Sequence, residues 1–268
     1  MDNRREKIAF QREVAKVLLE NLEHRGFVLT GSGALREHGL INRPTQDVDL
    51  FTRQQEASGF REATDHAIEA LRDSGYSVQV HRDLDTFKDI IITRADQSVQ
   101  VDFGVDYRGH DPAHMEIGAV LNMDDAVGSK VSALYSRQYP RDYLDVDAIR
   151  QSGRYTDESL LAVAESQDPG FDREYFSQIL TGVKALDPDE VEPYGVEESQ
   201  LRKVQQRLTD WAAELTSSRY TGLEEIRSLH RTDFPAQQKP GADKDTDPTE
   251  GRGKGPEQGR DQSGGIEL

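Results

Sequence analysis

The chain has no cysteine and no long hydrophobic run. Among its 268 residues the absence of cysteine excludes disulfide bonds, catalysis by a thiolate and zinc held by cysteine. No apolar stretch approaches the roughly 20 residues that a transmembrane helix needs. The first 25 residues read as a charged amphipathic helix and not as a signal peptide. We therefore expect a soluble, cytoplasmic protein without a membrane partner.

Positive charge is also scarce, with 33 lysines and arginines against 50 aspartates and glutamates and a formal net charge of −17. Repulsion at long range disfavours a general affinity for polyanions. A nucleic-acid ligand would have to bind at a local basic patch. The basic residues near the site described below are Arg36, Arg43, Arg53, Lys88, Arg137 and Arg141.

Two aspartates alternate with apolar residues in the segment Asp47-Val48-Asp49-Leu50. In an extended strand successive side chains point to opposite faces, so both aspartates share one face while Val48 and Leu50 face a core. Two carboxylates about 7 Å apart along a strand repel each other unless a cation lies between them. Mg²⁺ suits this arrangement because it takes one or two protein carboxylates and completes its shell with water and phosphate oxygens. Alternating acidic residues are, however, also common on solvated strands.

Gly31-Ser32-Gly33 lies where a predicted strand, 27–30, gives way to a short helix. Backbone N–H groups are free at the start of a helix, and glycine lets a phosphate group approach the backbone closely. The Ser32 hydroxyl can donate a hydrogen bond to a phosphate oxygen. The alternative is a plain turn in which Ser32 is an N-cap.

The order Gly-Ser, short helix, Arg-x-Thr-x-Asp-Val-Asp-Leu resembles the first motif of the DNA polymerase beta nucleotidyltransferase superfamily. More narrowly, it resembles the AbiEii/AbiGii branch of toxin–antitoxin systems, which includes the MenT-type toxins. The resemblance extends from about Phe27 to Ile149 and is most specific in its first half.

Two later segments match the same family. Asp102 lies on a predicted strand, 98–105, whose other face is apolar, and the resemblance implies that Asp102 completes the metal site. An exposed aspartate on a half-buried strand is the alternative. Lys130 lies beside the apolar stripe of a helix predicted over 124–138, and the resemblance implies that it reaches the nucleotide phosphates. The alternative for Lys130 is an ordinary surface lysine.

Arg141, Asp142 and Asp145 form the Arg-Asp-x-x-Asp signature that is typical of this branch. Spacing of i and i+3 places both carboxylates on one face of a helix. They could bind at the nucleotide site, orient Lys130 or an arginine, or, in the case of Asp142, favour the helix start.

The resemblance implies a metal-dependent enzyme that transfers a nucleoside monophosphate from a nucleoside triphosphate to an acceptor hydroxyl and releases pyrophosphate. It also implies a toxin that acts on tRNA 3′ ends and has a cognate antitoxin. We expect two Mg²⁺ ions, with Mn²⁺ as an alternative. The expected catalytic residues are Asp47, Asp49, Asp102 and Lys130, of which the three aspartates hold metal. The expected nucleotide-binding residues are Gly31, Ser32, Arg43, Lys130, Asp142 and Asp145.

The pattern of elements predicts an α+β fold, with a mixed β-sheet and packed helices over residues 1–122 and a helical domain over 123–232. The resemblance implies that the first part is a nucleotidyltransferase core and that the second completes its nucleotide site. Residues 233–268 are rich in Gly, Pro, Asp, Lys and Gln and are predicted to be a disordered tail. The helices expected in the second part are 124–138, 141–152, 156–166, 172–184, 194–216 and 220–230.

Two other functions remain open. The same fold could modify a small molecule such as an aminoglycoside, since an acidic surface attracts a cationic drug. A non-catalytic nucleotide-binding module is the third hypothesis, which nucleotide binding without metal dependence or turnover would favour.

Overall fold

The computed structural model describes residues 3–233. Contacts divide the chain into two compact units, residues 1–223 and residues 224–268. The first unit contains the sheet and the helices up to the first part of α9. Of the second unit only the last turns of α9 are described, so the disordered tail expected over 233–268 falls almost wholly outside the described residues and stays a prediction.

A mixed sheet of seven strands forms the centre of the first part of the chain, in the order β3-β4-β5-β2-β1-β7-β6. Its strands are β1 (Val28–Leu29), β2 (Asp47–Arg53), β3 (Ser77–Asp83), β4 (Phe87–Arg94), β5 (Gln97–Asp106), β6 (Ala113–Met115) and β7 (Gly118–Val120). β2 and β5 are neighbours and run parallel, while β4 and β5 form an antiparallel hairpin. This confirms the expected α+β class. The short strands β6 and β7 were not predicted, because three residues are too few for an alternating pattern.

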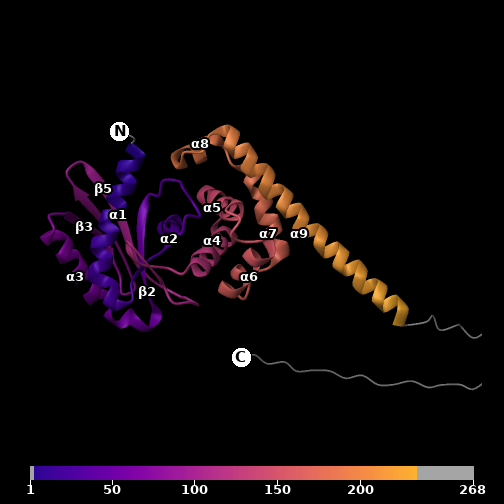
Figure 1. Ribbon diagram of the computed structural model, residues 1–268, viewed down its shortest axis with the longest axis horizontal. Coiled ribbons are helices and arrows are strands. Elements are labelled where there is room, and N and C mark those ends of the chain that lie inside the picture. Colours follow the sequence, from indigo (N-terminus) through magenta and orange to yellow (C-terminus); the bar gives the residue numbers. More distant parts are fainter. Residues whose placement is uncertain (1–2, 234–268) are drawn as a thin grey trace, which may run out of the picture. The chain divides into compact units, whose positions relative to one another are not determined.

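Helices cover both faces of the sheet (Figure 1). α1 (Asn3–Leu22) and α3 (Phe60–Asp73) pack on one face, and α2 (Gly31–Glu37) and α4 (Met123–Arg137) lie on the other. Val48 and Leu50 point into the core below α1 and are buried, as the alternation along β2 predicts. Asp47 and Asp49 therefore point to the face of the sheet that α4 borders.

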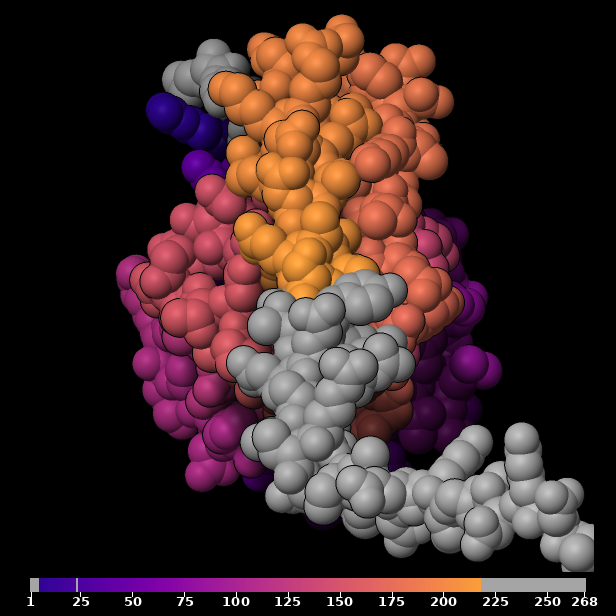
Figure 2. Space-filling model, turned by 90° about the vertical axis from the view of Figure 1, so that its right-hand side faces the viewer, coloured from indigo at the N-terminus to yellow at the C-terminus, as the bar shows by residue number. Residues whose placement is uncertain are grey.

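The rest of the chain is helical. Its elements are α5 (Pro140–Gln151), α6 (Asp157–Gln167), α7 (Arg173–Thr181), the 3-10 helix η3 (Gly182–Ala185), α8 (Pro188–Val191), the 3-10 helix η4 (Glu192–Tyr194) and α9 (Glu198–Asp233). A stripe of apolar residues along the first part of α9 is buried, and its Trp211 packs edge-on against Phe176 of α7. Figure 2 shows the first part of α9 at the surface with residues of the preceding helices on both sides.

Two expected features of this helical part are wrong. A break was predicted between residues 216 and 220, but α9 runs through it as one helix. The segment has no glycine or proline that would end a helix. The hydroxyls of Thr216 and Ser217 donate to carbonyls four residues earlier in the same helix. The helix predicted over 172–184 ends at Thr181 and continues only as the 3-10 turn η3. Among the described residues, no helix is both long and apolar enough to cross a membrane.

Candidate active site

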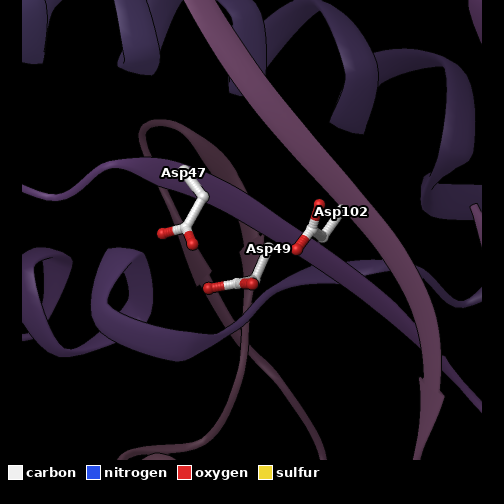
Figure 3. Close-up of side chains that lie close together, drawn as sticks. All are labelled: Asp47, Asp49 and Asp102. Atoms are coloured by element: carbon white, nitrogen blue, oxygen red, sulfur yellow. The ribbon is translucent and has the colours of Figure 1, made fainter. Parts of the chain in front are cut away.

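Three aspartates from β2 and β5 converge on one point of the sheet (Figure 3). Asp49 and Asp102 lie opposite each other in the register of the two parallel strands, and Asp47 is two residues earlier on the same face. Each offers a carboxylate oxygen, and these oxygens all lie within 4.8 Å of one another. All three side chains are half-buried.

Among the residues that the structure describes, no cation forms an ion pair with the carboxylates of this acidic cluster. Burial, together with the neighbouring charges of Asp47 and Asp102, raises the pKa of Asp49 from 3.8 to about 7. Burial and the charge of Asp47 also raise the pKa of Asp102, although a hydrogen bond of 2.8 Å from Gln100 to its carboxylate acts in the opposite direction. An all-oxygen set with mutual repulsion is the donor set that hard divalent cations prefer, so the three residues fit a site for such a cation.

Gly31 is required where the chain passes over the acidic cluster. Its φ is +56°, and a Cβ atom added there would lie 2.0 Å from Oδ2 of Asp49. A side chain would therefore be strained in its backbone and would collide with the carboxylate. The adjacent Thr30 N–H donates to the Asp49 carbonyl at 2.8 Å, which fixes the start of α2 beside the cluster.

Ser32 lies at the start of α2, directly after β1, as the sequence predicts. Its side chain is almost buried and takes part in two hydrogen bonds. Its Oγ accepts from Nη2 of Arg43 at 2.8 Å and donates to Oδ2 of Asp145 at 3.3 Å. The serine hydroxyl is thus held in a fixed position by a cation and a carboxylate.

Asp145 and Asp142 of α5 are fully buried and bind the cations of the site. Asp145 accepts two hydrogen bonds from Arg43, at 2.5 and 2.6 Å, and lies 3.0 Å from Nζ of Lys130. Asp142 lies 3.1 Å from the same Nζ and accepts from Nε of Arg137 at 2.8 Å. The i, i+3 spacing therefore presents both carboxylates to Lys130, one turn apart.

The state of Asp142 follows from these partners. Burial acts to raise the pKa of Asp142, but the hydrogen bond from Arg137 and the charge of Lys130 outweigh it and hold the pKa below its ordinary value. Asp142 is thus a carboxylate at neutral pH.

These groups surround one cavity of about 350 Å³. Its acidic wall comes from the sheet and contains Asp47, Asp49, Asp102 and Asp106, and its basic wall contains Arg43, Lys130, Arg137 and Arg141. Gly31 and Ser32 lie on the lining between them. Asp142 and Asp145 are not on the lining but behind the basic wall, which places them in contact with its cations.

Not every basic residue expected near the site lines the cavity. Arg36 is bonded to Gln11 and Thr45, Arg53 pairs with Asp111, and Lys88 is buried against Asp65. The lining residues that were not anticipated include Asp106 and Tyr194. Asp106 follows Asp102 by four residues on the same strand face, a signal that the alternation could have given. Tyr194 lies with its ring 5.2 Å from the guanidinium of Arg43, and nothing in its sequence context indicates this.

Comparison with known proteins gives a family match. The model of a family described as nucleotidyl transferase AbiEii toxin, type IV TA system, matches residues 15–234. No curated protein matches the chain.

Three solved structures are similar to the chain. A crystal structure from H. pylori, described as a nucleotidyltransferase candidate, is 14% identical with a TM-score of 0.55, covering 84% of this chain and 98% of that one. JHP933 from Helicobacter pylori is 16% identical with a TM-score of 0.49, covering 86% and 99%. The nucleotidyltransferase toxin MenT4 from Mycobacterium tuberculosis is 14% identical with a TM-score of 0.47, covering 76% and 83%. At 14% identity, the structure with the TM-score of 0.55 shows that the fold is shared and nothing more.

Proposed function

The chain belongs to the AbiEii family of nucleotidyltransferase toxins, because the family model matches most of its length, and we propose that it transfers a nucleoside monophosphate to the 3′ end of a tRNA. Membership makes it a nucleotidyltransferase and a toxin of a toxin–antitoxin system. The tRNA acceptor, the metal and the role of each residue are our proposal. Its cognate antitoxin would be a protein partner.

The observation that carries this proposal is the opposition of two charged walls across one cavity. Four carboxylates of the lining come from the sheet strands β2 and β5, and four cations come from α4, α5 and, in the case of Arg43, the segment between α2 and β2. A nucleoside triphosphate bound to divalent cations presents charges of both signs. Its metal ions suit the carboxylates and its phosphate oxygens suit the cations. A neutral ligand in this cavity would leave the charges of both walls without partners.

Asp47, Asp49 and Asp102 are the residues that would hold divalent cations, for which we propose two Mg²⁺, with Mn²⁺ as an alternative. When bound, such ions lower the pKa of an attacking hydroxyl and neutralise charge on the phosphates. The raised pKa of Asp49 supports this assignment, because the repulsion that causes it is relieved by a cation. Gly31 contributes by leaving space above Asp49.

Two cations of the opposite wall, Arg43 and Lys130, would bind the phosphates. Lys130 is a point charge held by two carboxylates, so its ammonium group is already positioned when the substrate arrives. Ser32 would donate to a phosphate oxygen in place of its present bond to Asp145, while Arg43 stays paired with that carboxylate. We propose that Asp142 and Asp145 contribute to nucleotide binding by positioning these cations.

The reaction would form a bond between the acceptor oxygen and the α-phosphorus and break the bond from that phosphorus to the bridging oxygen of pyrophosphate. The acceptor hydroxyl loses its proton, and Asp102 is the proposed base. Since the cavity is lined by both parts of the chain, we also propose that residues 123–232 form a helical domain that completes the site of a core spanning residues 1–122.

The test is incubation of the protein with each α-labelled nucleoside triphosphate, Mg²⁺ and total cellular RNA, followed by electrophoresis. Label is expected in the tRNA band, and periodate oxidation of the tRNA 3′ end should abolish it. Asp49→Asn should abolish labelling, whereas Asp85→Asn, which changes an exposed carboxylate paired with Arg61, should not. Label on an aminoglycoside but on no RNA would refute the tRNA acceptor, and binding without turnover or metal dependence would refute transfer altogether.

A further inference from the structure

The turn between α4 and α5 carries an exposed tyrosine between two arginines at the edge of the cavity. Tyr139 is 51% exposed. The guanidinium carbon of Arg137 lies 5.1 Å from the centre of its ring, and that of Arg141 lies 5.5 Å from it. Both arginines line the cavity, whereas Tyr139 does not. The ring therefore lies just outside the cavity, against two arginines that line its edge.

The backbone holds this turn in one conformation. Gln138 ends α4 with a φ of +55°, a left-handed conformation that is unusual for a residue other than glycine. Tyr139 is extended, and Pro140 starts α5 with its fixed φ. Since the two helices pack against each other, the ring is presented by a short rigid connection. A preformed surface of this kind loses little entropy when a ligand binds.

The turn is also the basic patch that an acidic protein of this kind needs for a nucleic acid. Arg137 shares its charge with Asp142, but among the described residues Arg141 has no carboxylate partner. Arg53 and Lys88, by contrast, are paired with carboxylates and lie outside the cavity lining. Among the described cations that line the cavity, Arg141 is thus the one without a carboxylate partner, and Arg137 lies beside the same tyrosine ring.

We propose that Arg137, Tyr139 and Arg141 bind the single-stranded end of the nucleic-acid acceptor, with a base stacked on Tyr139 and a backbone phosphate at Arg141. This inference rests on the proposed function, since it assigns the acceptor's binding surface. Aromatic rings beside cations bind single strands with little sequence preference. Ser32, Arg43 and Lys130 inside the cavity are the proposed contacts of the incoming triphosphate. The exposed ring of Tyr139 is therefore assigned to the nucleic-acid acceptor.

Steady-state transfer with total tRNA and a labelled nucleoside triphosphate tests the proposal in the full-length protein. Tyr139→Ala should raise the KM for tRNA about 5- to 150-fold, the range that loss of one stacked base produces. The KM for the triphosphate and kcat should change less than about twofold. Tyr139→Phe keeps the ring and should behave like the unmodified protein. The matched control is Tyr175→Ala, because Tyr175 of α7 is 48% exposed and does not line the cavity.

A binding measurement that needs no turnover separates this inference from the proposed function. Fluorescence anisotropy of a labelled single-stranded RNA dodecamer should show weaker binding by Tyr139→Ala and by Arg141→Gln, and Arg141→Gln should lower the salt dependence by about one ion. Circular dichroism and thermal melting establish whether each variant is folded. If Tyr139→Ala does not fold, the binding result for Arg141→Gln tests the inference.

The outcomes are distinct. Unchanged KM for tRNA and unchanged dodecamer binding in both variants would overturn the inference. A rise in the KM for the triphosphate alone would also overturn it, because the ring would then contact the incoming nucleotide. Transfer to no RNA by the unmodified protein, with dodecamer binding that still depends on Tyr139, would refute the proposed tRNA acceptor and leave the RNA-binding surface standing.

Discussion

Replacing Asp49 with asparagine should make the metal-free protein more stable while it abolishes nucleotidyl transfer. Asp49 has a pKa of about 7 in the folded protein because it is partly buried beside two other carboxylates. In the unfolded chain its ordinary value is 3.8. The folded state therefore binds more protons than the unfolded state between about pH 4 and pH 7. Stability must fall as the pH rises through that range and level off above it.

The magnitude follows from the difference between the two pKa values, which corresponds to about 4 kcal/mol of destabilisation at pH 8. Asparagine is nearly isosteric and has no charge, so Asp49→Asn should recover a large part of this. We expect a gain of about 2 kcal/mol or more at pH 8, a rise in Tm of about 4–8 °C. At pH 4.5 Asp49 is protonated in the folded state and largely ionised in the unfolded chain, so the destabilisation is only about 1 kcal/mol and the gain should fall to about a quarter of its value at pH 8.

Thermal melting in the presence of EDTA at pH 4.5 and pH 8 measures both values. Asp85→Asn is the control, because it removes a carboxylate that is 91% exposed and should change stability by less than about 0.5 kcal/mol. Adding Mg²⁺ should stabilise the unmodified protein at pH 8 and leave Asp49→Asn almost unchanged. A variant that is no more stable at pH 8 than the unmodified protein would refute the account of repulsion within the cluster.

Three further predictions concern other parts of the site. Gly31→Ala should lower kcat/KM at least about 100-fold, because its Cβ would displace the Asp49 carboxylate; normal steady-state kinetics would contradict this. Asp145→Ala should lower the free energy of unfolding by about 3–5 kcal/mol, because Arg43 and Lys130 lose a buried partner; urea denaturation measures it, and a loss below about 1 kcal/mol would argue against the network. Metal affinity, measured by calorimetry, should weaken about tenfold from pH 8 to pH 6, because a cation competes with the proton on Asp49; an affinity independent of pH would show that Asp49 is not a ligand.

Several parts of the site could be predicted because they depend on short-range order in the chain. The alternation in β2 is enough to put Val48 and Leu50 in the core and both aspartates on the other face. The i, i+3 spacing of Asp142 and Asp145 is enough to direct both carboxylates to one side of α5. The position of Ser32 at the start of a helix follows from the apolar run before it and the glycines beside it.

Other features could not be predicted, because the sequence does not show which distant segments meet. The bond between Arg43 and Asp145 joins residues 102 positions apart, and Ser32 is 113 positions from the same carboxylate. Tyr194 lines the same cavity and is even more distant in the sequence from Arg43, which its ring contacts. No motif surrounds it. Arg36 and Lys88 looked as suitable as Arg43, but the fold gave them other partners.

Local order along the chain determined the class of fold and the faces of the strands and helices on which the aspartates and Ser32 lie, since each depends on backbone geometry over a few residues. The tertiary structure decided that Asp102 lies opposite Asp49 and that Lys130 is held between two carboxylates of α5. It also decided which arginines remain available beside the cavity. These are matters of register and packing between segments, which no local pattern encodes.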